Sequence, residues 1–304
     1  MKKIATVGTF DGMHRGHMAV TDTLLKGGAA LGLLPLAISF PDHPLMVIAP
    51  ERAPRLIMPP GEKVAILDGL GIETSLLDFT PELCRLSASD WLRLLRDNHQ
   101  VAAIVLGYDN TFGSDGRHLR REDYYRIAAE LGLTCIEAQE IPGCSSSAIR
   151  KAIIDGNIPA ANSLLGHPFE LLGHIVEGNR IGRTIGFPTA NLRPANPSRQ
   201  LLPPPGVYAA RAILPDGLGY PAVANIGFRP TIDERLREAD PRIEAHILGF
   251  NADIYGSPLR LQLLQLLRPE QKFPSLEFLK TQIARDADQT RAFFASKPDL
   301  VNPN

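Results

Sequence analysis

The chain has 304 residues, of which 44% are hydrophobic and 21% are charged, and its formal net charge is -1. This length is sufficient for two domains of ordinary size, each with its own hydrophobic core. The charge excludes a global basic field that would hold nucleic acid or an anionic membrane, so any anion must be recognised by locally placed residues.

The first half of the chain alternates between strand and helix patterns. Strands are predicted at 4–7, 34–40, 101–107 and 133–141, and helices at 17–32, 61–71, 87–100, 121–132 and 145–156. The run at 101–107 is nearly all apolar, as in strands that are buried on both faces of a parallel sheet. We therefore expect a doubly wound, Rossmann-like α/β domain over residues 1–166.

The second half has a different texture, with short alternating runs between clusters of Gly, Pro and Asn. These runs lie at 170–178, 206–214, 220–227, 243–250 and 259–267. They predict a mainly antiparallel β barrel or sandwich. An amphipathic helix capped by Ser275, with Glu277 in its first turn, is predicted to follow and to end at residue 295. We assign residues 167–304 to this all-β domain with a C-terminal helix.

The segment TVGTFDGMHRGH, residues 6–17, joins the first predicted strand to the first predicted helix. Such loops lie at the carboxyl edge of an α/β sheet, where free amides at a helix start bind phosphate. The segment has neither Gly-x-Gly-x-x-Gly nor Gly-Lys-Ser/Thr, which excludes a standard dinucleotide site and a P-loop. His14 and His17 could each donate a hydrogen bond to a polyphosphate. They could instead bind a metal ion, but no third ligand is evident and Asp11 lies across the turn.

This segment resembles the G-x-F-D-G-x-H-x-G-H signature of nucleotidylyltransferases, in the version of bacterial bifunctional riboflavin kinase/FAD synthetases. The resemblance implies that His14 and His17 assist attack of the FMN phosphate on the α-phosphorus of ATP. It implies an ATP site that includes Gly8, Phe10, Asp11 and Gly16. The attacking phosphate is already ionised at neutral pH, so the histidines need only position it and stabilise charge.

Three later segments of the first domain resemble the same family. SFPDHP at 39–44 resembles its F-x-P-H-P segment, and VLGYDNTFG at 105–113 resembles V-G-x-D-F-x-F-G, which implies that Asp109 contacts ATP or the flavin phosphate. Asn110, Thr111 and the segment 116–125 depart from the family pattern and leave flavin binding in this domain open.

The third segment, CSSSAIR at 144–150, resembles S-S-T-x-I-R and implies that Ser146, Ser147 and Arg150 grip the triphosphate. From the residues alone, serines at a helix start are usually caps. An arginine one turn further, beside exposed amides, favours a phosphate role.

The stretch EGNRIGRTIGFPTANL at 177–192 has, by composition, the character of a long connecting loop. Its glycines, Gly178, Gly182 and Gly186, could instead let the backbone close over a polyphosphate. Thr189 and Asn191 lie two residues apart, so in an extended segment their oxygens face one side and suit Mg²⁺. The string resembles G-R-x-x-G-F-P-T-A-N of riboflavin kinases. That resemblance implies Mg²⁺-ATP held by Thr189 and Asn191, and ATP or flavin contacts from the three glycines, Arg183, Phe187 and Pro188.

Phosphoryl transfer to an alcohol requires a carboxylate near the hydroxyl. In a strand Glu244 shares a face with His246, although an ordinary exposed strand glutamate is an alternative. The segment resembles the family's E-x-H-x-x-x-F-x-x-x-x-Y-G at Glu244, His246, Phe250, Tyr255 and Gly256, which implies that Glu244 takes the proton of the riboflavin 5′-hydroxyl. ANIGFRPT at 224–231 also resembles the family and implies flavin or ATP contacts from Asn225, Phe228 and Arg229.

These resemblances imply one enzyme with two reactions. The second domain converts riboflavin and ATP to FMN, the first joins FMN to AMP from a second ATP to give FAD and pyrophosphate, and both require Mg²⁺. The alternative is a monofunctional riboflavin kinase with an impaired N-terminal nucleotide-binding domain. A flavin-binding regulator without activity would not need Glu244 as a base.

Cysteine usage bears on the compartment. Cys84, Cys135 and Cys144 are far apart and have no metal-ligand spacing, so we expect packing residues in a reducing compartment. The start of the chain lacks the apolar core of a secretory signal, and no run of about eighteen apolar residues occurs. We expect a cytoplasmic enzyme with small-molecule substrates, without nucleic-acid or membrane partners; the oligomeric state stays open.

Overall fold

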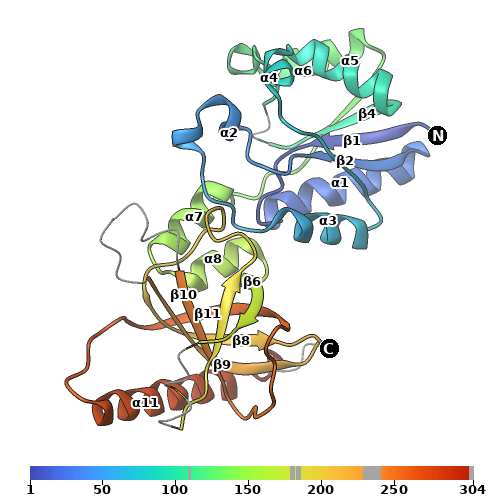
Figure 1. Ribbon diagram of the computed structural model, residues 1–304. Coiled ribbons are helices and arrows are strands. Elements are labelled where there is room, and N and C mark those ends of the chain that lie inside the picture. The colour runs from blue at the N-terminus through green and yellow to red at the C-terminus, as the bar shows by residue number, and fades with distance from the viewer. Residues whose placement is uncertain (109–110, 179–181, 183–185, 229–240, 301–304) are drawn as a thin grey trace. The chain divides into compact units, whose positions relative to one another are not determined.

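The computed structural model describes residues 1–108, 111–178, 182, 186–228 and 241–300. The chain divides into two compact units, Met1–Ser146 and Ser147–Asn304 (Figure 1). The domain limit predicted after residue 166 lies beyond this division. Helices α7 (Ser146–Ile154) and α8 (Ile158–Leu165) occupy the interval, and α8 packs on strands of the second unit.

The first unit is a five-stranded parallel sheet in the order β3-β2-β1-β4-β5. Its strands are β1 (Lys3–Val7), β2 (Leu34–Ser39), β3 (Glu73–Leu76), β4 (Val101–Leu106) and β5 (Thr134–Glu137). Its helices are α1 (Arg15–Leu31), α2 (Leu45–Ile48), α3 (Pro60–Gly69), α4 (Pro81–Arg85), α5 (Ala88–His99) and α6 (Arg121–Glu130), with 3-10 turns η1 (Pro50–Arg52) and η2 (Gly116–His118). The predicted doubly wound α/β fold is confirmed.

Alternate residues of the strands fill two cores on opposite faces of this sheet. Val7 of β1 belongs to a core with Trp91 of α5 and Tyr124 of α6, whereas Ile4 belongs to a core with Leu24 of α1 and Leu67 of α3. Figure 1 shows α5 and α6 on one side of the sheet and α1 and α3 on the other. Successive strand residues point to opposite faces, so these apolar strands require helices on both.

The sheet order places the ligand-binding edge. The strand order reverses between β1 and β4, which are neighbours at the centre of the sheet. In open α/β sheets a crevice forms at such a switch point, outside the carboxyl ends of the strands. The histidine-containing loop after β1 therefore begins at the position where this fold binds ligands.

The second unit is built on a closed barrel in the order β10-β7-β6-β11-β8-β9, with all pairings antiparallel. Its strands are β6 (Phe169–Val176), β7 (Ala190–Pro194), β8 (Gly206–Ile213), β9 (Gly219–Phe228), β10 (Pro241–Ile247) and β11 (Pro258–Pro269), followed by α11 (Leu276–Ala295) and η3 (Pro298–Leu300). The prediction of a barrel or sandwich thus resolves to a barrel. Strand β7 was not predicted, because its five residues follow a Gly-rich and polar stretch.

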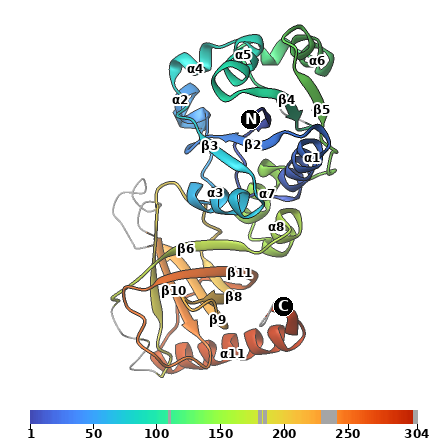
Figure 2. The same cartoon turned by 90° about the vertical axis from the view of Figure 1, so that its right-hand side faces the viewer.

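Helix α11 packs on β8 and β9 of the barrel, and Figure 2 shows it running along the barrel. Its predicted cap is confirmed, since the Ser275 side chain accepts a hydrogen bond from the Phe278 backbone N–H. On its inner side the Asp286 carboxylate, 1% exposed, accepts hydrogen bonds from the Arg268 guanidinium of β11 and from Gln282. None of the helices in the described ranges is long and apolar enough to cross a membrane.

Candidate active sites

The loop after β1 has an unusual backbone. Phe10 (φ 49°), Gly12 (φ 82°) and Met13 (φ 39°) all lie in the left-handed region, which non-glycine residues rarely adopt and which concentrates at functional sites. A Cβ at Gly8 would lie 3.2 Å from the Phe10 ring, so glycine suits this turn. The loop leads into the N-terminus of α1, whose first turn holds no acidic residue. The amides of that turn are therefore suited to an anion.

The two histidines of this loop stack on each other, with ring centroids 3.6 Å apart and an interplanar angle of 17°. The His17 backbone N–H donates to Nδ1 of His14 (3.3 Å), so His14 caps α1. A neutral His14 ring then carries its proton on Nε2, which donates to the Ser146 hydroxyl 3.2 Å away. His14 is 5% exposed and His17 is half-buried, so His17 is the more accessible of the two.

The start of α7 meets this loop through Ser146. Its hydroxyl donates to the Asp11 carbonyl at 3.3 Å. The Cys144 Sγ lies 3.6 Å from Nδ1 of His14, so this cysteine borders the predicted catalytic histidine. A Cβ at Gly16 would lie 3.1 Å from the His14 ring. In the part of the chain that the structure describes, no group of three His, Cys, Asp or Glu side chains is placed to hold a metal ion.

Within the loop, the side chains of Phe10 and Asp11 are buried, with Phe10 2% and Asp11 3% exposed. The Phe10 ring packs edge-on against His17, with centroids 5.2 Å apart. Both carboxylate oxygens of Asp11 accept from the Ile57 backbone N–H, at 2.9 and 3.1 Å, and one also accepts from the N–H of Met58 at 3.1 Å. These contacts fix the loop, and direct contact of either side chain with ATP stays a prediction.

The remaining residues predicted for this site lie either outside the described residues or in the second unit. Asp109 and Asn110 lie outside the described residues. Ser147 is exposed and Arg150 half-buried in α7, on the second unit's side of the division. Their approach to the histidine loop therefore stays a prediction.

In the barrel, strand pairing brings three predicted residues into one row. Glu244 of β10 lies directly opposite Asn191 of β7 on one side and Asn225 of β9 on the other. Residues opposite each other on paired strands point to the same face. The neighbours of Glu244 along β10, Ile243 and Ala245, are buried in the barrel core, so the row lies on the outer face.

The Glu244 side chain is 19% exposed, and Oε1 accepts from the Arg242 guanidinium at 2.7 Å. This ion pair joins residues i and i+2 of one strand, which share a face. The carboxylate is thus fixed by a neighbour and partly accessible from solvent.

Two glycines bring the backbone against the predicted Mg²⁺ ligands. A Cβ at Gly178 would lie 2.1 Å from Nδ2 of Asn191, and one at Gly182 would lie 2.3 Å from the Phe187 carbonyl and 3.3 Å from the Thr189 hydroxyl. Larger residues do not fit at these positions. The Thr189 and Asn191 oxygens are hard donors of the kind that Mg²⁺ prefers, so the set fits this ion.

The segment before Thr189 is held by His246 of β10. Its Nδ1 lies 2.8 Å from the Pro188 carbonyl oxygen, and its ring packs edge-on against Phe187. Gly186 is exposed and adopts φ 87°, which favours glycine. Arg183 and Arg229 lie outside the described residues, and Phe228, at the end of β9, is half-buried.

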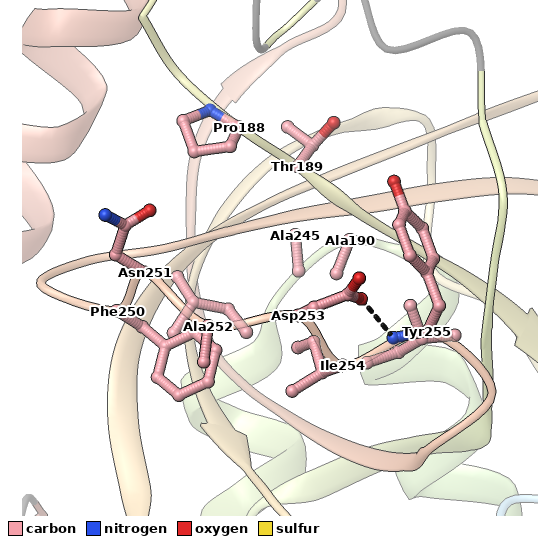
Figure 3. A pocket seen from close by; sticks show the side chains of 12 residues that line it. Pro188, Thr189, Ala190, Ala245, Phe250, Asn251, Ala252, Asp253, Ile254 and Tyr255 are labelled. Atoms are coloured by element: carbon pink, nitrogen blue, oxygen red, sulfur yellow. Dashed lines mark hydrogen bonds between the residues drawn. The ribbon is translucent and has the colours of Figure 1, made fainter.

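A pocket of about 290 Å³ opens next to Thr189. Figure 3 shows it between the Pro188–Ala190 segment and the loop 250–255, with Ala245 of β10 in its wall. The loop is closed on itself by a hydrogen bond from the Tyr255 backbone N–H to the Asp253 carboxylate (3.1 Å). Sequence reasoning missed this pocket, although it quoted the residues Phe250 and Tyr255 that line it.

Comparisons with known proteins cover both halves of the chain. The FAD synthetase family matches residues 1–149 and the riboflavin kinase family matches residues 165–294. A bifunctional riboflavin kinase/FMN adenylyltransferase of Escherichia coli (strain K12) is 37% identical over 308 residues, which is 97% of this chain and 94% of that protein. One of Bacillus subtilis (strain 168) is 32% identical over 299 residues, 97% of this chain and 93% of that protein.

Among solved structures, a protein from Streptococcus pneumoniae described as a macrolide-efflux protein is similar to this chain with a TM-score of 0.83 and 30% identity, covering 95% of this chain and 94% of its own. Nothing in these comparisons favours the monofunctional alternative, because both catalytic domains match. The chain belongs to the family of bifunctional riboflavin kinase/FMN adenylyltransferases and carries both activities.

Proposed function

We propose that Glu244 is the general base of the kinase and that His14 and His17 serve the adenylyltransferase. The observation that carries the kinase assignment is the row across three strands, in which Glu244 lies between Asn191 and Asn225. A fixed carboxylate between two amide side chains can accept the proton of the riboflavin 5′-hydroxyl while the amides orient the reacting groups. The freed oxygen then attacks the γ-phosphorus of ATP, and ADP leaves.

Mg²⁺ is the metal we propose for this reaction, held by Thr189 and Asn191. The ion would supply charge stabilisation of the transferred phosphoryl group. Gly178 and Gly182 let the backbone approach Asn191 and the Phe187 carbonyl closely, since a Cβ at either position would strike those groups. His246 keeps the segment in place through the Pro188 carbonyl.

The pocket beside Thr189 is our proposed site for the ATP nucleoside. Its walls include Ile175, Ile247, Phe250 and Ala245, which suit an aromatic base, and Asp253 adds a polar group. Because Thr189 lines the same pocket, the phosphates of a nucleotide bound there would lie near this proposed metal ligand.

In the first unit, the His17 ring donates a hydrogen bond to the reacting phosphates, and the His14 ring orients that of His17. Attack of the FMN phosphate on the α-phosphorus of ATP forms the new phosphoanhydride and releases pyrophosphate. Stacking on His14 and edge packing on Phe10 restrict the His17 ring to one orientation, which supports a role in stabilising developing charge. The residues we propose for binding the triphosphate are Ser146, Ser147, Arg150 and Asp109.

We propose the cytoplasm as the compartment of the enzyme.

A magnesium titration of FMN formation by the Asn191→Ala variant tests this assignment. Loss of a ligand is expected to raise the Mg²⁺ concentration for half-maximal FMN formation by about tenfold or more. Asn196→Ala, an exposed asparagine just beyond β7, is the matched control and should leave it unchanged. An unaltered magnesium requirement in Asn191→Ala would remove this residue from the metal site.

A further inference from the structure

A buried lysine lies under the adenylyltransferase loops and takes no part in the reaction as described. Lys63, on α3, is 5% exposed. Its ammonium donates to the carbonyl of Thr9, in the loop after β1, at 2.7 Å, and to the carbonyl of Phe40, in the loop after β2, at 2.6 Å. Two loops at the carboxyl edge of the sheet are thus held by one side chain.

Asp11 links the same elements in the opposite direction. Its carboxylate accepts from the backbone N–H groups of Ile57 and Met58, which lie just before the N-cap of α3. The histidine loop therefore holds the start of α3, and α3 holds the histidine loop through Lys63. A closed set of buried hydrogen bonds of this kind restricts all its members together.

The set continues to the histidines. The Asp11 carbonyl accepts from the Ser146 hydroxyl, and that hydroxyl is 3.2 Å from Nε2 of His14. His14 in turn stacks on His17. Displacement of the Thr9–Asp11 backbone is therefore transmitted to the ring that we assign to the reacting phosphates.

Burial of the Lys63 ammonium destabilises the fold unless its hydrogen-bond donors are paired. Lysine is seldom fully buried, and an ammonium in a low-dielectric site is destabilising unless its donors are paired. Burial lowers the pKa of Lys63 to about 8, against the opposing charges of Asp11 and Asp42, which raise it. An apolar residue would fill the same volume without this penalty but could not hold two carbonyls.

We propose that Lys63 is a positioning residue of FMN adenylylation, whose ammonium fixes the loops after β1 and β2 so that His14 and His17 face the substrates. It does not reach the reacting atoms and acts through the Thr9 and Phe40 carbonyls. The proposal rests on the assignment of the histidines under the proposed function.

The test compares Lys63→Met, Lys63→Arg and the control Lys26→Met in the full chain, with FMN and ATP as substrates. Met preserves the apolar stem, Arg preserves the charge, and Lys26 is an exposed lysine of α1 that pairs with Asp22. Lys63→Met should lower kcat for FAD formation by about tenfold or more. FMN formation by the same molecules should stay within twofold of the unaltered chain.

A pH profile separates positioning from simple support of the fold. In the unaltered chain FAD formation should decline as pH rises through about 8, the pKa of Lys63, because the neutral amine binds the carbonyls less strongly. Lys63→Arg should form FAD faster than Lys63→Met. Its FAD formation should not decline near pH 8, since a guanidinium stays charged.

Wild-type kcat in Lys63→Met would overturn the proposal. If Lys63→Met does not unfold cooperatively, the profiles of the unaltered chain and Lys63→Arg decide, and identical profiles would overturn it. Failure of the histidine assignment is distinguishable, because FAD formation would then survive His17→Ala whatever Lys63 does.

Discussion

Replacing Glu244 with glutamine removes a charge and almost no volume, so it isolates the proposed base. The side chain keeps its place between Asn191 and Asn225 on neighbouring strands. What it loses is the capacity to accept a proton and its ion pair with Arg242.

The expected loss of rate far exceeds the expected loss of stability. A positioned general base contributes on the order of 10²- to 10⁴-fold, which corresponds to about 3 to 5 kcal/mol in the activation barrier. The ion pair is partly exposed, 47% at Arg242 and 19% at Glu244, and such pairs contribute at most about 1 kcal/mol to stability. Glu244→Gln should therefore fold normally and form FMN at least a hundredfold more slowly.

The assay follows riboflavin, FMN and FAD by chromatography, with FAD formation from supplied FMN as an internal control. Glu170→Gln is the matched variant. Glu170 lies on β6, is 17% exposed and pairs with Arg260 and Gln262, and β6 does not pair with β10. Kinase activity within a few-fold of the unaltered chain in Glu244→Gln would refute the assignment. Equal losses in both variants would refute it as well.

Two further substitutions test the adenylyltransferase and the barrel. His17→Ala should lower FAD formation from FMN by about a hundredfold with FMN formation unchanged, measured in the same assay; normal FAD synthesis would remove the histidine loop from the mechanism. Asp286→Asn leaves the Arg268 guanidinium without its buried carboxylate and should reduce the free energy of unfolding by about 3 kcal/mol. Urea unfolding, monitored by the loss of kinase activity, measures this free energy. A change below about 1 kcal/mol would show that the pair does not hold α11 to the barrel.

Local signals in the sequence were sufficient for most of the first unit. The apolar run at Val101–Leu106 predicts a buried strand, and the glycine at residue 32, with φ 65°, ends α1 where the pattern predicts. Ser87 caps α5 by accepting from the Asp90 N–H, and serine is among the residues preferred at a helix start. These features depend on residues within a few positions of each other.

Features set by distant pairing could not be predicted in the same way. The placement of Glu244 between two asparagines depends on the registers of β10 with β7 and β9, which no local pattern specifies. From the sequence, a lysine in a predicted helix is expected to face solvent. The burial of Lys63 is evident only from the packing of α3 against the loops after β1 and β2. Cys144, which we expected to be a packing residue, lies 3.6 Å from Nδ1 of His14, and no local pattern specifies that contact.

If one chain carries two separate sites that act in sequence, FMN must form before FAD. The most direct test incubates the purified protein with riboflavin, ATP and Mg²⁺ and resolves riboflavin, FMN and FAD over time. FMN should appear first, and FAD should follow. FMN that accumulates without FAD, with FMN and ATP both in excess, would contradict it and leave the His14 and His17 loop without a catalytic role.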